Sequence, residues 1–112
     1  MKIAFVVSEN LRLYTEDIEI FAEVQDDIVI NRADAVDERS AKYLEAVGYR
    51  INEFSPDLER YGEGAPEKIV DDADKIILFH YGSPEVKRIA EYARGKDKPH
   101  EVILRPLKIK LH

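Results

Sequence analysis

The stretch that decides the fold runs from Asp27 to Pro56 and reads DIVINRADAVDERSAKYLEAVGYRINEFSP. Its first apolar run, Ile28 to Asn31, is typical of a buried strand, and a further strand is predicted over Tyr49 to Phe54. Between them lies a helical pattern that ends at Gly48, the residue type that most often terminates a helix. Strand, turn, helix and strand in this order predict a βαβ unit, and the first turn of such a unit commonly holds phosphate or nucleotide.

The helix of this unit has a predicted start and a predicted buried face. Asp34 is the predicted N-cap, and Asp37 is its acidic partner three residues later. Residues at helical spacing form one face, and these are Val36, Ser40, Tyr43, Leu44 and Val47.

Strands and helices alternate on both sides of this unit. Further strands are predicted over Lys2 to Val7, Lys75 to His80 and Glu101 to Leu104. A helix is predicted after the first strand, with Asn10 or Thr15 as its cap and with one face made of Leu11, Tyr14, Ile18, Phe21 and Ala22. A short helix is predicted from Pro66 to Ala73. The last predicted helix runs from Ser83-Pro84 to Gly95 and buries Val86, Ile89, Ala90 and Ala93. The alternation predicts an α/β fold: a three-layer Rossmann-like sandwich with a mostly parallel sheet of about five strands and helices on both faces.

Length and composition predict one soluble domain over residues 1–112, with 45% hydrophobic and 36% charged residues. The absence of cysteine excludes disulfides and thiol chemistry. The first strand is too short for a signal peptide, and no apolar run is long enough to span a membrane, so a cytoplasmic location is expected. A net charge of −6 argues against a duplex nucleic acid as partner. The many Glu, Lys, Ile and Tyr residues resemble a thermophile composition.

Two further segments carry hypotheses. Residues 55–65 contain Pro56, Gly62 and Gly64 and form a candidate lid loop. In residues 105–112, Leu107, Ile109 and Leu111 alternate with Lys108 and Lys110, which indicates an edge strand or a dimerisation arm. Charge is also uneven, because residues 16–27 are acidic and residues 96–110 are basic. Solvated faces of opposite sign are one interpretation, and self-association into a homodimer is the other.

Taken together, these motifs resemble the SLOG superfamily of Rossmann-like nucleotide-binding proteins, in particular its small YspA-type single-domain members. The residues that carry the resemblance are Val7-Ser8-Glu9 for the family's Gly-Ser-Arg, Asn31 to Asp37 for Gly-Gly-Ala-Arg-Gly-Ala-Asp, Phe54 to Gly62 for Phe-Pro-Ala-Asp-Trp, Ala73-Asp74 for Ala-Asp, and Tyr81-Gly82-Ser83 for the glycine turn after the fourth strand. The resemblance implies that a nucleotide or nucleotide-derived ligand binds at the carboxyl ends of the strands.

The chain departs from the family where the phosphate would lie. Asn31, Arg32 and Ala35 replace the three glycines of the second-strand turn, and side chains there would crowd a ligand. Glu9 replaces an arginine, which reverses the charge at the first turn. The chain is therefore interpreted as a diverged member with a degenerate glycine motif.

The expected ligand-binding residues lie in the turns that follow the strands, and they are Ser8, Glu9, Asn31, Arg32, Asp37, Tyr61, Tyr81, Gly82 and Ser83. Gly82 and Ser83 at a helix N-terminus form the predicted anion site or, alternatively, simply a good helix start. Arg32 is expected to contact a phosphate or to pair with Asp34 or Asp37. The two tyrosines are expected to stack on a base or to be partly buried.

Two other functions stay open. A ligand-free degenerate module could act in protein interaction or self-assembly, given the missing glycines and the alternating tail. Hydrolysis or transfer at a nucleotide or nucleoside N-glycosidic bond is the third hypothesis; Glu85 lies close to the position of the glutamate in related transferases, but more commonly such a residue serves the first helical turn. No catalytic residue is assigned. His80, His100 and His112 are too scattered for a metal site, and no cofactor is expected.

Overall fold

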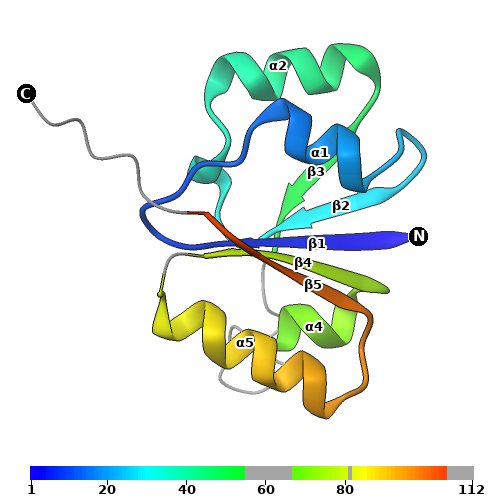
Figure 1. The fold of residues 1–112 in the computed structure, drawn as a ribbon. Helices are drawn as coiled ribbons and strands as arrows, with labels where there is room; N and C mark the ends of the chain where they lie inside the picture. Colours follow the sequence, from blue (N-terminus) through cyan, green and yellow to red (C-terminus); the bar gives the residue numbers. More distant parts are fainter. Residues whose placement is uncertain (55–66, 81, 106–112) are drawn as a thin grey trace, which may run out of the picture.

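The computed structural model describes residues 1–54, 67–80 and 82–105 (Figure 1). Its elements are, in order, β1 (Lys2–Val7), α1 (Thr15–Phe21), β2 (Asp27–Ile30), the 3-10 helix η1 (Ala33–Ala35), α2 (Glu38–Val47), β3 (Arg50–Glu53), α4 (Lys68–Asp72), β4 (Lys75–His80), α5 (Pro84–Gly95) and β5 (His100–Leu104). The five strands form one all-parallel sheet in the order β3-β2-β1-β4-β5. The predicted α/β fold is confirmed.

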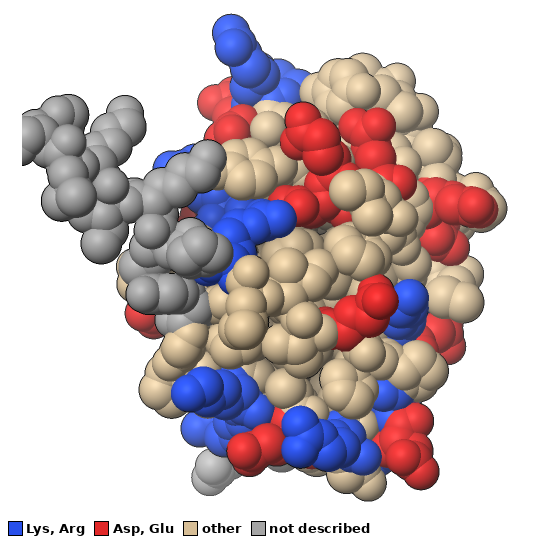
Figure 2. Space-filling view, viewed as in Figure 1, with Lys and Arg blue, Asp and Glu red and all other residues tan. Residues whose placement is uncertain are grey.

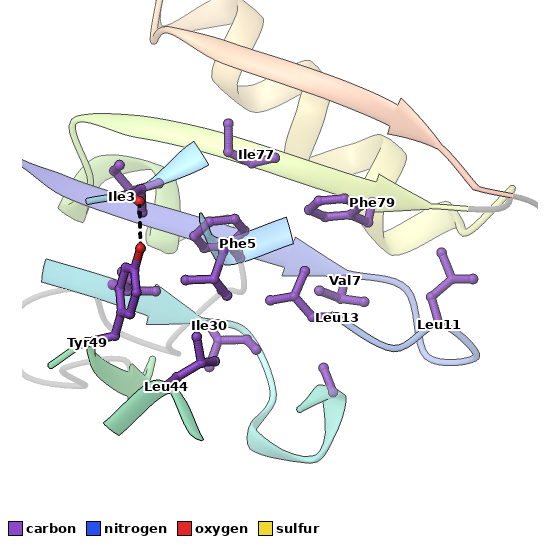
Figure 3. Close-up of a cluster of buried hydrophobic side chains, with 14 residues drawn as sticks. Ile3, Phe5, Val7, Leu11, Leu13, Ile30, Leu44, Tyr49, Ile77 and Phe79 are labelled. Carbon is purple, nitrogen blue, oxygen red and sulfur yellow. Dashed lines mark hydrogen bonds between the residues drawn. The ribbon is translucent and has the colours of Figure 1, made fainter. Parts of the chain in front are cut away.

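Helices cover both faces of this sheet, with α1 and α2 on one side and α4 and α5 on the other (Figure 1). The central strands β1 and β4 are apolar at almost every position because each of their faces packs against a helical layer. Phe5 and Phe79 stack beneath α1 with their ring centroids 6.4 Å apart (Figure 3). On the opposite face, Val6 and Leu78 pack against α5. The sheet therefore has two cores, one under each layer.

The strand order places a reversal between β1 and β4. From β1 the chain builds outward through β2 to β3, and the second half builds outward from β4 to β5 in the other direction. In open parallel sheets of this type, ligands bind in the crevice outside the carboxyl ends of the two strands at this reversal. The turns that follow β1 and β4 are therefore the first place to look for a site.

The start of α1 differs from the prediction. Leu11 and Leu13 are buried in an extended segment, and the helix begins at Thr15 with Tyr14 as its N-cap rather than Asn10 or Thr15. The reason is the carboxylate of Asp17, which accepts a hydrogen bond from the Tyr14 N–H at 2.8 Å. The expected burial of Tyr14 was also wrong, because its side chain is exposed.

The start and face of α2 also differ from the prediction. Asp37 is itself the N-cap and accepts from the Ser40 N–H at 2.7 Å, whereas Asp34 lies in η1. Of the expected apolar face only Leu44 is fully buried, while Tyr43 is 48% and Val47 is 46% exposed. This helix packs over the edge of the sheet, where the short strand β3 can bury only a small part of its apolar face.

Other local predictions are confirmed. Gly48 ends α2 with φ of +116°, a left-handed conformation that suits glycine. Ser83 and Pro84 begin α5 as predicted, and Gly95 is its last residue. The candidate lid, the tail beyond Arg105 and the start of the short helix at Pro66 lie outside the described residues. In the described part of the chain, no helix has both the length and the apolar character needed to cross a membrane.

Candidate functional site

The second-strand turn begins with Asn31, whose side chain binds the backbone of β1. Its Oδ1 accepts from the Val7 N–H at 2.8 Å, and its Nδ2 donates to the Val7 carbonyl at 3.0 Å. The Asn31 N–H in turn donates to the carbonyl of Phe5 at 3.1 Å. The asparagine therefore continues the pairing of β1 with β2 beyond the end of the strand, and its amide is fully engaged within the fold.

Arg32 lies across the same turn, with its side chain only 20% exposed. Its guanidinium donates to the Ser8 carbonyl at 2.7 Å and to the Leu11 carbonyl, and it pairs with Asp34 at 2.9 Å. The ion-pair interpretation of Arg32 is thus confirmed, with Asp34 as the partner. The two carbonyl contacts fix the turn that follows β1.

The backbone of this turn does not form an anion-binding loop. Arg32 is extended, with φ of −151°, and Asp97 is the one non-glycine residue with positive φ in the described ranges. The Ala33 N–H donates to the Glu53 carboxylate at 3.1 Å, so it also has a partner. The side chains of Asn31 and Arg32 therefore fill this turn.

An open cavity lies instead between the turns after β1 and β4. We call it the switch-point cavity; it has a volume of about 230 Å³ and is lined by Ser8, Glu9, Asn10, Leu11, Gly82, Ser83 and Pro84. Ser8 is only 5% exposed, and its Oγ is buried without a hydrogen-bond partner. A buried hydroxyl without a partner is uncommon, because its desolvation is not compensated. Ser8 Oγ and Arg32 Nε, which are both buried without a partner among the described side chains, lie at this end of the sheet.

The start of α5 forms the other wall of the cavity. Gly82 has φ of +69°, and its N–H donates to Nδ1 of His80 at 3.2 Å. The Val86 N–H donates to Ser83 Oγ at 3.4 Å, and the Lys87 N–H donates to the Ser83 carbonyl. These bonds leave fewer donors for an anion than the sequence predicted, although the positive end of the helix dipole still faces the cavity. Glu85 lies in the first turn of α5 and does not line the cavity.

The structure brings together four of the predicted site residues, namely Ser8, Glu9, Gly82 and Ser83. Asn31 and Arg32 support the first turn rather than line the cavity. Asp37 caps α2, and the hydrogen bond from the Ser40 backbone lowers the pKa of its carboxyl group. Tyr61 and Tyr81 lie outside the described residues. Sequence reasoning missed Asn10 and Leu11 as lining residues, although their place directly after β1 was a usable signal.

A second cluster at this end of the sheet was also missed. The Arg105 guanidinium binds both carboxylate oxygens of Asp17, at 2.7 and 2.9 Å, and lies over the Phe79 ring at 4.8 Å (Figure 1 shows the adjoining ends of β5 and α1). The hydrogen bonds to Asp17 raise the pKa of Arg105 above its ordinary value. Because both groups are paired, we interpret this cluster as structural.

Comparison with known proteins finds no matching family, curated protein or solved structure. The described side chains include no group of three or more His, Asp or Glu residues arranged to hold a metal ion.

Proposed function

We propose that the chain binds a nucleotide-derived small molecule in the switch-point cavity. The observation that carries the proposal is the unpartnered Ser8 hydroxyl, buried in the wall of a cavity at the reversal of a parallel sheet. Sites of this fold type lie at that reversal. The resemblance of Val7-Ser8-Glu9 and Gly82-Ser83 to SLOG motifs supports the ligand class, because both segments line or adjoin the cavity.

The size and charge of the cavity favour a neutral ligand over a phosphate. Its volume of about 230 Å³ is below the roughly 300–1,000 Å³ of common ligand pockets, so it fits a compact group such as a nucleoside sugar. Glu9 places a carboxylate in the lining, where it repels a phosphate dianion and accepts hydrogen bonds from hydroxyl groups. Arg32 is engaged with protein carbonyls and supports the wall instead of binding phosphate.

A thermal-shift series tests the proposal. The panel pairs each nucleoside with its mono- and diphosphate and adds ADP-ribose and cyclic nucleotides. A ligand at 100 times its Kd stabilises the folded state by about 2.7 kcal/mol, which raises the melting temperature by several degrees. We expect the shift with neutral members and a smaller shift with their phosphates. No shift across the panel would contradict the proposal.

Two variants locate the site. Ser8→Ala removes the unpartnered oxygen and should weaken binding roughly two- to twelvefold, since one hydrogen bond contributes roughly 0.5–1.5 kcal/mol. Glu9→Gln should reduce the difference in affinity between a nucleoside and its phosphorylated form, because it removes the carboxylate that repels the phosphate. Glu91→Gln, the same change on the exposed side of α5, should leave affinity unaltered. Equal effects of the two Glu→Gln changes would place the ligand elsewhere.

A further inference from the structure

Strand β3 is an edge strand of the described sheet, and some of its backbone groups point away from that sheet. The Phe54 N–H donates to the Ile30 carbonyl at 2.8 Å, so the alternation along the strand directs the backbone groups of Arg50 and Asn52 toward β2 as well. Those of Ile51 and Glu53 therefore face outward. An edge of this kind accepts an additional strand through its main-chain hydrogen bonds.

A hollow that is more apolar than polar, although Glu45, Arg50 and Glu53 also line it, lies on the α2 side of this edge; we call it the apolar hollow. Its volume is about 490 Å³, and its lining residues come from η1, α2, β2 and β3 with the segments beside them. Val36, Ala41 and Ile51 give it aliphatic walls, and Tyr49 gives it an aromatic one. A strand added beside β3 would direct every second side chain into this hollow.

A more acidic hollow lies on the opposite side of β3. It has a volume of about 410 Å³, and its lining includes Asp27, Glu53 and Asp72 with Lys2. Lys2 pairs with Asp72 at 2.8 Å, Arg50 pairs with Asp27 at 3.5 Å, and the Glu53 carboxylate accepts from the Ala33 N–H on the α2 side. The three carboxylates and one lysine of the lining still carry a formal excess of negative charge. The intervening side chains of an added strand would point toward these carboxylates, so cations are favoured at those positions.

One segment of this chain has the matching pattern. In Pro106-Leu107-Lys108-Ile109-Lys110-Leu111, three aliphatic residues alternate with two lysines. We propose that residues 107–111 of one copy bind along β3 of a second copy as an added strand, with the aliphatic side chains under α2 and the lysines over the acidic hollow. This inference is independent of the proposed ligand site.

The geometry of the sheet excludes the same contact within one molecule. Strands β3 and β5 form opposite edges, four strand spacings apart, which is about 19 Å. Five residues extend over at most about 18 Å, so a tail that leaves the end of β5 would use its full length merely to cross the sheet. The segment that pairs with β3 must come from another copy.

The edge at β5 is the competing surface. Figure 2 shows mainly uncharged surface over the middle of the sheet on this side, between acidic side chains over α1 and a charged surface over α5, although Glu101 of β5 is exposed. Leu104 is 72% exposed there, and Val102 is also exposed. This edge has apolar side chains, and its described carboxylate Glu101 pairs with Lys75 at 3.7 Å. The test must therefore separate the two edges.

The first experiment measures self-association of the full chain by sedimentation velocity across a concentration series. Ala41→Arg places a charged side chain in the apolar hollow and should weaken association at least about tenfold. Ala46→Arg is the same change on the exposed side of α2 and should have no effect. Leu104→Lys should also have none. A monomer at all concentrations, or loss of association through Leu104→Lys alone, would overturn the proposal.

The second experiment measures the segment directly. The acceptor is the full chain with Leu107, Ile109 and Leu111 all changed to Ser, which removes its own apolar pattern. A fluorescein-labelled peptide RPLKIKLH, matching residues 105–112, should bind this acceptor in an anisotropy titration. The peptide RPLLIKKH has the same composition without the alternation and should bind at least about tenfold more weakly. Equal binding of the two peptides, or binding unaffected by Ala41→Arg in the acceptor, would overturn the proposal.

Discussion

The turn after β2 and the turns after β1 and β4 meet at the same end of the sheet but have opposite character. The first is filled by its own side chains, with Asn31 bound to Val7 and Arg32 bound to two carbonyls of the neighbouring turn. The others enclose the switch-point cavity and leave the Ser8 hydroxyl without a partner. We therefore expect stability to depend mainly on the first turn, and the binding that we propose to depend on the other two. Substitutions on each side should reveal this division.

The largest effect is expected from Arg32→Ala. It removes the donor to the Ser8 and Leu11 carbonyls in a partly buried region, which should lower the free energy of unfolding by roughly 2–4 kcal/mol in a urea titration. Asp34→Ala should cost less than about 0.5 kcal/mol, because that carboxylate is 80% exposed. Arg39→Ala on exposed α2 controls for loss of charge. A cost as small as that of the control would mean that Arg32 does not hold the turn.

Asn31→Ala comes next. It removes both side-chain bonds to Val7 and should lower the free energy of unfolding by about 1–3 kcal/mol. Hydrogen exchange at the Val7 amide should accelerate more than exchange elsewhere in β1. Asn52→Ala, an exposed asparagine on β3, should leave both quantities nearly unchanged.

Gly82→Ala tests the wall formed by the β4 turn. At φ of +69° a β-carbon is strained although no atom lies within 4 Å of it, so the expected loss is about 1 kcal/mol from the backbone alone. Gly95→Ala should have the opposite sign and stabilise by roughly 0.5–1 kcal/mol, because this residue is helical and its surroundings are open. Chemical denaturation measures both. If Gly82→Ala left the free energy of unfolding unchanged or raised it, the strained conformation at this position would be contradicted.

The smallest effect is expected from Ser8→Ala. Because its Oγ has no partner, removing it should change the free energy of unfolding by less than about 0.5 kcal/mol, in the stabilising direction. A loss greater than about 1 kcal/mol would show that the hydroxyl is bonded within the fold, and the proposed site would lose its main support.

Local sequence patterns correctly predicted the bounds of the central strands and the end of α2. The bounds of β1 and β4 were correct because both strands are apolar on both faces, and Gly48 was correct because its conformation suits glycine. The start of α1 was not predictable in this way, since its capping carboxylate at Asp17 is held by Arg105, 88 residues away. The exposure of Tyr43 depends on the position of α2 at the edge of the sheet, which no local pattern contains.

Local sequence patterns were also insufficient to predict the side-chain contacts of the candidate site. The positions of Ser8, Glu9, Gly82 and Ser83 followed from the rule that turns at the carboxyl ends of parallel strands converge. The closure of the second-strand turn depends on the reach of Arg32 to carbonyls 21 and 24 residues earlier in the chain. Such side-chain contacts between distant segments become visible only once the strand order is known.

The ion pair of Asp17 with Arg105 also bears on how this molecule forms during translation. The nascent first half contains β1, β2 and β3, but one side of β1 stays without a neighbour until β4 has been made. The α1 cap stays without its arginine until residue 105 has left the ribosome. Because contacts this distant in sequence slow folding, we expect the packing of α1 against the sheet to stay incomplete until residue 105 has been made.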